Sequence, residues 1–219
     1  GDVTKDMFLD MYRGYYKNEL YIDYVTNGVH YPTWVAEDWE QLHLKYFGKE
    51  FLKDQMNPKY WSKIYDVPNE EIWAIRNKLR KVLVDELKVR LRVEMTRRQD
   101  SPKTILKAVE SLNENTLTIG FARRFATYKR AHLLFQNLDR LSKIVNSEKY
   151  PVQFVFAGKA HPADKAGQDL IKNIIEVSRR PEFVGKIVFI ENYDMEIAKK
   201  LVQGVDIWMN TPTRPLEAS

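Results

Sequence analysis

Four short apolar segments alternate with longer amphipathic segments in the second half of the sequence, and this alternation constrains the fold most. The apolar segments cover 117–121, 152–157, 186–190 and 205–209 and are rich in β-branched and aromatic residues. The segments between them, about 128–145, 163–178 and 195–203, carry apolar residues at helical spacing. Buried strands joined by helices form parallel sheets with right-handed crossovers. We therefore predict an α/β fold with a parallel sheet and helices on both of its faces.

The first 112 residues are predicted to be largely helical. Helical spacing covers about 4–16, 32–47 and 104–112, and a long helix is expected from about 68 to 98. Residues 21–25 alternate like a strand and lead into a loop that contains Asn27, His30 and Trp34. We expect a helical hinge segment over 1–112 and a sheet-containing part over 113–219.

A cluster of cations follows the first predicted strand. Four of the eight residues from 123 to 130 are basic, namely Arg123, Arg124, Lys129 and Arg130. Guanidinium groups, an ammonium group and the N–H groups of a helix start could together bind a phosphate. A lone basic pair would indicate a solvated loop, whereas a cluster that continues a strand favours an anion site. Polar residues also follow the other strands, at 158–162, 191–194 and 210–219. Ligands of parallel sheets bind at this edge, so we predict the site there.

Composition excludes several classes of function. The chain has no cysteine, which excludes disulfides and thiolate metal sites and makes the cytoplasm the expected location. His43 has no second ligand at metal spacing, so no metal site is predicted. No apolar run approaches the roughly 20 residues needed to cross a bilayer. The net charge of +5 is spread along the chain without a nucleic-acid-binding motif, which indicates small anionic ligands. GxGxxG and P-loop fingerprints are also absent.

Five motifs together resemble the α-glucan (glycogen, maltodextrin) phosphorylase family, in its shorter bacterial and archaeal form. They are Asn27-Gly28 with Trp34, Arg123-Arg124 with Tyr128-Lys129, Gly158-Lys159-Ala160, Glu191-Asn192-Tyr193 and Glu217-Ala218-Ser219. The resemblance implies a two-lobed glycosyltransferase-B fold, of which this chain would be the hinge and the first half of the Rossmann-like C-terminal lobe. It also implies pyridoxal phosphate as cofactor. The partners would be α-1,4-glucan, inorganic phosphate and glucose 1-phosphate.

The resemblance further implies roles for particular residues. Arg124 and Lys129 would be catalytic, binding the substrate phosphate, and Arg123 would bind the cofactor phosphate. Asn27, Glu217 and the main chain of Ala218 and Ser219 would bind the glucosyl unit, while Trp34 and Tyr193 would flank the pyridoxal ring. Ala126 stands where the longer phosphorylases have a histidine. The Schiff-base lysine of the family would lie beyond Ser219, so we expect a fragment that is inactive alone and whose bare apolar surfaces favour a homo-oligomer.

Two alternatives remain open from the sequence. A retaining nucleotide-sugar transferase of the glycogen synthase type would share the fold, the basic pair after a strand and a glutamate near the fourth strand. A non-catalytic carbohydrate-binding module could use Trp34, Trp39 and Trp61 as a platform for sugars. Binding of ADP-glucose in place of phosphate would favour the first alternative. Retention of glucan without a need for Arg124 and Lys129 would favour the second.

Overall fold

The computed structural model describes residues 2–25, 27–214, 216 and 217, which fall into two compact units, Gly1–Pro32 and Thr33–Ser219. The first unit contains α1 (Asp2–Phe8) and two 3-10 helices, η1 (Leu9–Met11) and η2 (Lys17–Glu19). The prediction of a strand over 21–25 is wrong, because these residues have no regular structure. A single extended segment without a partner cannot form ladder hydrogen bonds. The short helix α2 (Tyr31–Trp34) lies at the boundary between the units.

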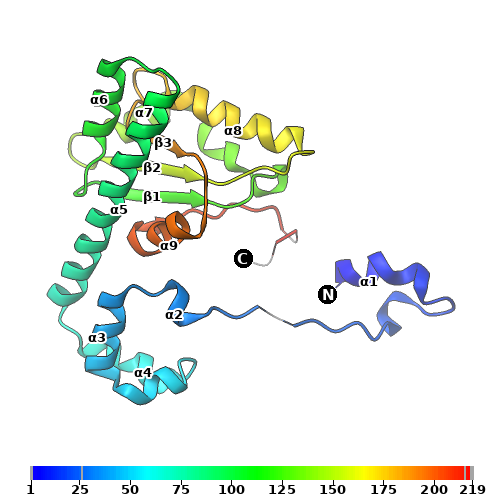
Figure 1. Ribbon diagram of the computed structural model, residues 1–219. Helices are drawn as coiled ribbons and strands as arrows, with labels where there is room; N and C mark the ends of the chain where they lie inside the picture. Colours follow the sequence, from blue (N-terminus) through cyan, green and yellow to red (C-terminus); the bar gives the residue numbers. More distant parts are fainter. Residues whose placement is uncertain (1, 26, 215, 218–219) are drawn as a thin grey trace. The chain divides into compact units, whose positions relative to one another are not determined.

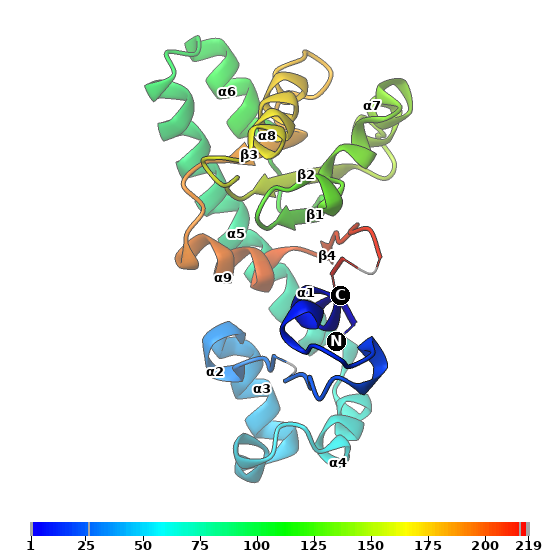
Figure 2. The ribbon, with the colours of Figure 1, turned by 90° about the vertical axis from the view of Figure 1, so that its right-hand side faces the viewer.

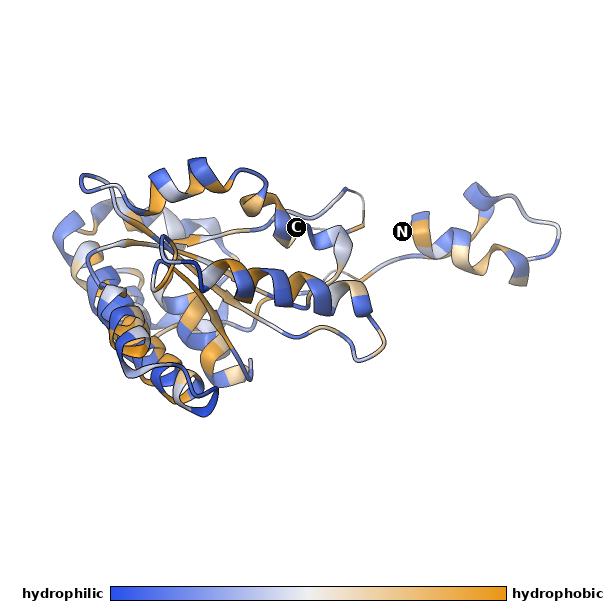
Figure 3. Cartoon of the chain, turned by 90° about the horizontal axis from the view of Figure 1, so that it is seen from above, coloured by the Kyte–Doolittle hydropathy of each residue, from blue (hydrophilic) through white to orange (hydrophobic). Residues whose placement is uncertain are grey.

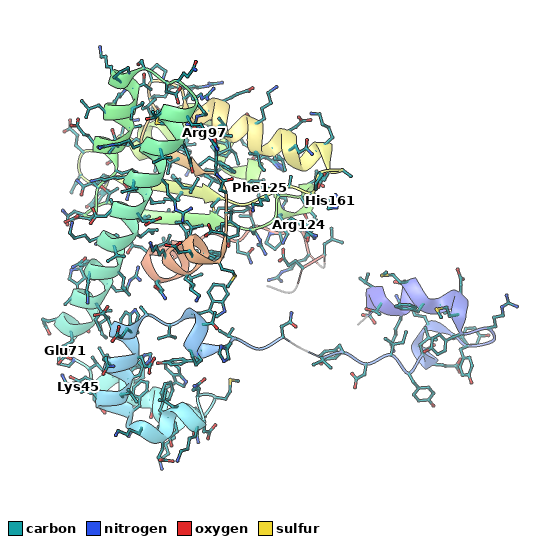
Figure 4. All side chains as sticks on the ribbon, in the orientation of Figure 1. Lys45, Glu71, Arg97, Arg124, Phe125 and His161 are labelled. Atoms are coloured by element: carbon teal, nitrogen blue, oxygen red, sulfur yellow. The ribbon has the colours of Figure 1, made fainter. Side chains whose placement is uncertain are left out.

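The second unit begins with a helical part that is built around one long helix. Its elements are α3 (Glu37–Phe47), η3 (Lys49–Lys53), α4 (Pro58–Trp61), η4 (Ser62–Asp66), α5 (Asn69–Arg97) and α6 (Pro102–Ser111). The 29 residues of α5 confirm the predicted long helix. Glu71 at the start of α5 accepts hydrogen bonds from Lys45 and Tyr46 of α3, at 2.9 and 2.8 Å (Figure 4). These contacts join the first turn of α5 to α3.

The sheet of the second unit has four parallel strands in the order β3-β2-β1-β4. The strands are β1 (Leu117–Ala122), β2 (Val152–Ala157), β3 (Ile187–Ile190) and β4 (Ile207–Trp208). Leu117 pairs with Val152 of β2, and Ile119 pairs with Ile207 of β4. The connecting helices are η5 (Thr127–Lys129), η6 (Ala131–Phe135), α7 (Leu138–Val145), α8 (Lys165–Ser178) and α9 (Met195–Gly204). All four predicted strands are therefore present, although β4 is shorter than expected.

The prediction of one continuous helix over 128–145 is wrong. Two 3-10 helices come first, and Arg130 between them adopts a left-handed conformation with φ +50°. Asn137 then begins α7, and its side-chain oxygen accepts a hydrogen bond from the Arg140 N–H group at 2.9 Å. Because a left-handed residue ends a right-handed helix, the cationic loop is kept apart from α7.

Each face of the sheet has its own core. Phe154 and Phe156 of β2 pack into an aromatic core with α7 and α8, whereas Val155 and Ala157 pack into an aliphatic core with α5, α6 and α9. This alternation follows from the period of two along a strand. Figures 1 and 2 show the flanking helices, and Figure 3 shows hydrophilic and hydrophobic residues along each of them. The structure confirms the predicted α/β class with both faces of the sheet covered. None of the helices described in 2–25 or 27–214 is long and apolar enough to span a membrane.

A buried ionic network attaches α5 to the amino ends of β1 and β4. Asp206, just before β4, accepts hydrogen bonds from Arg80 at 2.8 Å and from Arg76 at 3.2 Å. Its second oxygen accepts the Thr118 N–H group of β1 at 2.9 Å. Arg80 is only 5% exposed. This network fixes where β4 lies against β1 and hence where the segment after β4 emerges.

Candidate functional site

The strand order places a topological switch point between β1 and β4. The chain moves outward from β1 to β2 and β3 and then returns to the other side of β1 as β4. In open parallel sheets the crevice at such a point, outside the carboxyl ends of the strands, is where ligands bind. The segments that leave β1 and β4 there are 123–130 and 209–217. The predicted cationic cluster and Glu217 therefore come to the same crevice.

The segments that follow β1 and β2 run side by side beyond the sheet. Phe125 donates its N–H to the Lys159 carbonyl at 2.9 Å and forms a bridge with Ala160. Gly158 makes this approach feasible, because a Cβ atom there would lie 2.0 Å from the Arg123 carbonyl oxygen, and its φ is +144°. Phe125 is buried, with its ring 5.6 Å from that of Phe121. The main chain around Arg123 and Arg124 is thus rigidly held.

The segment after β4 is joined to the cationic loop by hydrogen bonds that main-chain carbonyls accept. Arg130 donates from Nε to the Thr211 carbonyl at 2.7 Å, and Thr211 donates its hydroxyl to the Lys129 carbonyl at 3.0 Å. The Thr213 N–H group donates to the Tyr128 carbonyl at 2.8 Å. These bonds bring the chain back across the crevice and place Glu217 opposite Arg123 and Lys129.

Arg123, Lys129 and Glu217 form a compact ionic cluster. Glu217 Oε1 accepts hydrogen bonds from Arg123 Nη2 and from Lys129 Nζ, the latter at 3.1 Å. Lys129 is buried, and the side chains of Arg123 and Glu217 are 16% and 21% exposed. Two cations thus share one carboxylate, which leaves an excess of one positive charge in a largely water-excluded place. The cluster therefore attracts a further anion.

Unsatisfied hydrogen-bonding groups of this cluster indicate where such an anion can bind. Nε and Nη1 of Arg123 are buried and have no acceptor among the residues that the structure describes, and Glu217 Oε2 likewise has no donor there. Buried donors without a partner are costly, so a site that keeps two of them is suited to a ligand. Nε and Nη1 lie on opposite sides of Nη2, so each of them can donate to a different anion oxygen or ligand group. A cofactor phosphate, which the resemblance assigns to Arg123, fits one of these free donors.

Arg124 lies on a separate groove. Arg124, Lys159, Ala160, His161 and Tyr193 line an open groove of about 310 Å³ at the carboxyl edge of the sheet. Figure 4 shows Arg124 and His161 at this edge. Arg124 is exposed, and burial raises the pKa of the Tyr193 hydroxyl. The groove thus combines cationic groups with a half-buried phenol ring. The structure brings Arg124 to Tyr193, while Lys129 lies with Arg123 and Glu217.

The remaining predicted site residues are placed as follows. Asn27 is an exposed residue of the first unit. The carbonyl group of Trp34 accepts a hydrogen bond from Gln203 of α9 at 3.1 Å. Ala218 and Ser219 lie outside the described residues. Trp39 and Trp61 belong to an aromatic cluster around His43, with ring centroids 6.2 and 5.3 Å from its ring. No group of three or more histidine or carboxylate side chains that could hold a metal ion occurs in the described parts of the chain.

Two residues near the groove had no predicted role. His161 was recognised only as part of the polar sequence after β2, and it lines the groove. Glu94 of α5 is buried and accepts the Glu191 N–H group at 2.9 Å. The sequence did contain a signal for Glu94, because it follows Leu87 and Leu91 at the spacing of the buried side of α5. A charged residue in that row indicates a buried polar contact.

Comparisons with known proteins agree with the resemblance. The family model for carbohydrate phosphorylase matches residues 2–219. A glycogen phosphorylase of Aquifex aeolicus is 44% identical over 219 residues, a match that covers 99% of this chain and 31% of that protein. A maltodextrin phosphorylase of Thermococcus litoralis is 40% identical, with 99% of this chain and 26% of that protein covered. For a glycogen phosphorylase of Mycobacterium tuberculosis the identity is 39%, with coverage of 100% and 25%. The chain spans only about a quarter to a third of the length of these relatives. Because the family model matches residues 2–219, the chain belongs to the carbohydrate phosphorylase family.

Proposed function

We propose that this chain supplies the phosphate-binding edge of an α-glucan phosphorylase. Such an enzyme cleaves the terminal α-1,4-linked glucose of a glucan with inorganic phosphate and releases glucose 1-phosphate. The observation that carries the proposal is the pair of cations at the switch point, Arg123 and the buried Lys129, where two buried guanidinium donors have no acceptor in the described structure. A phosphate group would accept from one of these donors and balance the excess positive charge.

The two cationic places at this edge of the sheet, the cluster around Arg123 and the groove at Arg124, would each bind a different phosphate group. Arg124 faces the open groove, which a diffusing substrate phosphate can enter. Lys129 is proposed for the same phosphate from the family resemblance, and in this structure its ammonium group binds Glu217 beside Arg123. A dianion held by these cations stabilises the positive charge that develops at the glucosyl carbon when the glycosidic bond breaks. Glu217 would bind a hydroxyl group of that glucosyl unit, and the sugar-binding roles of Asn27, Ala218 and Ser219 stay predictions from the resemblance.

Pyridoxal phosphate would occupy the same edge in the complete enzyme. Arg123 would hold its phosphate through a free guanidinium donor, and Trp34 and Tyr193 would flank its ring. When bound, the cofactor supplies a phosphate that exchanges a proton with the substrate phosphate. Glu217 keeps the Arg123 guanidinium oriented through its bond to Nη2. A cytoplasmic location and a homo-oligomeric state stay predictions from the sequence.

Anion binding by the chain itself tests the proposal. We expect a phosphate titration followed by NMR to perturb the amide signals of 123–130, with weak affinity that falls as salt is added. The variant Arg124→Ala/Lys129→Ala should lose this response. Lys149→Ala removes one charge just before β2, at the opposite edge of the sheet, and should retain it.

Three outcomes would contradict the proposal. A phosphate response that survives in Arg124→Ala/Lys129→Ala would show that these two side chains do not bind the phosphate. Binding of ADP-glucose without binding of phosphate would indicate a nucleotide-sugar transferase. Retention of maltodextrin by the double variant would indicate a carbohydrate-binding module.

A further inference from the structure

Glu94 is a buried acid whose position packing does not explain. It lies on α5 between Leu91 and Met95 of the aliphatic core and is 6% exposed. Its Oε1 atom accepts the Glu191 N–H group, whereas its buried Oε2 atom has no donor in the part of the chain that is described. A carboxyl group with one unsatisfied oxygen in a core costs stability. The position of Glu94 therefore points to a role other than packing.

The end of α5 holds a single residue of the sheet edge at three points. Besides the bond from Glu94 to its N–H group, Glu191 receives hydrogen bonds on its carboxylate from Arg97 and from Arg98, the latter at 2.8 Å. Glu191 is the first residue after β3. Figure 4 shows Arg97 on α5. The main chain and the side chain of Glu191 are thus both fixed to the end of α5. These contacts define where the turn after β3 begins.

The turn that starts at Glu191 leads directly to the groove. Asn192 adopts a left-handed conformation with φ +52°, and Tyr193 follows and lines the groove together with Arg124 and His161. Asp194 then caps α9 by accepting the Ile197 N–H group at 2.9 Å. Because both ends of this short turn are fixed, a shift at Glu191 must be absorbed at Asn192 and Tyr193.

The charge of Glu94 depends on the groups around it. Burial and the neighbouring Glu191 carboxylate raise the pKa of Glu94 to about 7, while the hydrogen bond from Glu191 N–H, Arg98 just after α5 and Arg90 on α5 oppose this. From α9 and its cap, Glu196 and Asp194 face Arg90, at 4.0 and 3.8 Å. The ionised form accepts a stronger, charge-assisted hydrogen bond from the Glu191 amide but repels the Glu191 carboxylate. Protonation therefore changes both contacts between α5 and this residue.

We propose that Glu94 is a positioning residue for the groove: through the main chain of Glu191 it sets where Tyr193 lies, and its ionisation state adjusts that position. The inference rests on the proposed function for its significance, since the groove is the place proposed for cofactor and substrate. The contacts themselves exist without any ligand, so the positioning can be measured on the chain alone.

An NMR titration without ligand tests this inference. The amide signals of Glu191, Asn192 and Tyr193 are followed from about pH 5 to about pH 9, a range that brackets a carboxyl group with a raised pKa. We expect all three to shift with one common midpoint near pH 7. Glu94→Gln, a variant of nearly the same shape, should abolish this transition. Glu86→Gln should keep it, because Glu86 also lies on α5 but binds Arg90 and Lys200.

Either of two results would overturn the inference. One is a wild-type chain in which these amides show no transition in that range, a measurement that needs no variant to fold. The other is a transition that persists unchanged in Glu94→Gln. A failure of phosphate binding would leave both measurements unaffected, so this inference and the proposed function can fail separately.

Discussion

The ionic network at Asp206 should be a major determinant of stability, and Asp206→Ala is the perturbation that tests it. The carboxylate accepts two guanidinium hydrogen bonds and the Thr118 N–H group. Its side chain is 12% exposed, against 6% for that of Arg80. The substitution removes all three hydrogen bonds at once and leaves a buried guanidinium group with its charge uncompensated.

The expected loss of folding free energy is about 4 kcal/mol. Removing one partner of a buried ion pair costs about 3–5 kcal/mol, and an unsatisfied buried N–H group costs about 1–3 kcal/mol. The lower end of each range applies, because Arg76 is partly exposed and Arg80 keeps its bonds to Glu114 and Asn77. For a chain of this length such a loss lowers Tm by roughly 8–16 °C.

Urea denaturation followed by far-UV circular dichroism measures this loss. Asp85→Ala is the matched control, because Asp85 forms an exposed pair with Lys81 four residues away on the same helix. Exposed pairs of this kind contribute about 0.3–0.5 kcal/mol. If Asp206→Ala destabilised the chain no more than Asp85→Ala, the network would not hold β4 in place, and the argument for the position of the switch point would fail.

Three further predictions concern the site. Gly158→Ala should destabilise by at least about 2 kcal/mol in urea denaturation, since its Cβ would collide with the Arg123 carbonyl, whereas Gly28→Ala, with no atom within 4 Å, should be tolerated. In an active phosphorylase containing this chain, Arg124→Ala should reduce kcat/KM for phosphate more than Arg124→Lys, with a loss of about 1.5–3 kcal/mol for Ala. Equal phosphate kinetics in wild type and Arg124→Ala would refute the assignment of Arg124 to the substrate phosphate. The folded-state pKa of Glu94 is raised from 4.5 to about 7, so the free energy of unfolding of the wild type should fall as pH rises between these two values. Glu94→Gln should remove this penalty, which is on the order of 3 kcal/mol above pH 7. A wild-type stability that stays flat between these pH values would contradict this prediction.

The sheet could be predicted because its strands are local, continuous apolar runs. Three of the four fall within the predicted segments, β1 extends one residue beyond its segment to Ala122, and 152–157 has the predicted bounds. β4 is shorter than expected because only Ile207 and Trp208 pair with β1. The division of the chain was less accessible to sequence. Residues 33–112 form one compact unit with the sheet, since α5 and α6 supply part of its core.

The partners of the site residues could not be predicted, because they depend on the return of the chain after β4. Sequence spacing indicated that Arg123 and Glu217 would share an edge, but not that they would bind each other. That pairing requires the hydrogen bonds of Arg130 and Thr211, which involve main-chain carbonyls that any residue carries. The left-handed conformation of Arg130 was also invisible, since arginine has no preference for it.

The pairing of Glu217 with Arg123 bears on how the site can accept phosphate. If Glu217 occupied the whole guanidinium group, an anion would first have to displace it. Glu217 contacts Nη2, and the buried donors Nε and Nη1 remain without an acceptor in the described chain. A phosphate can therefore bind one free donor of Arg123, Nε or Nη1, while Glu217 keeps Nη2. The carboxylate then acts as an orienting group for the guanidinium plane, and its charge limits the cost of holding Arg123 and Lys129 close together before the anion arrives.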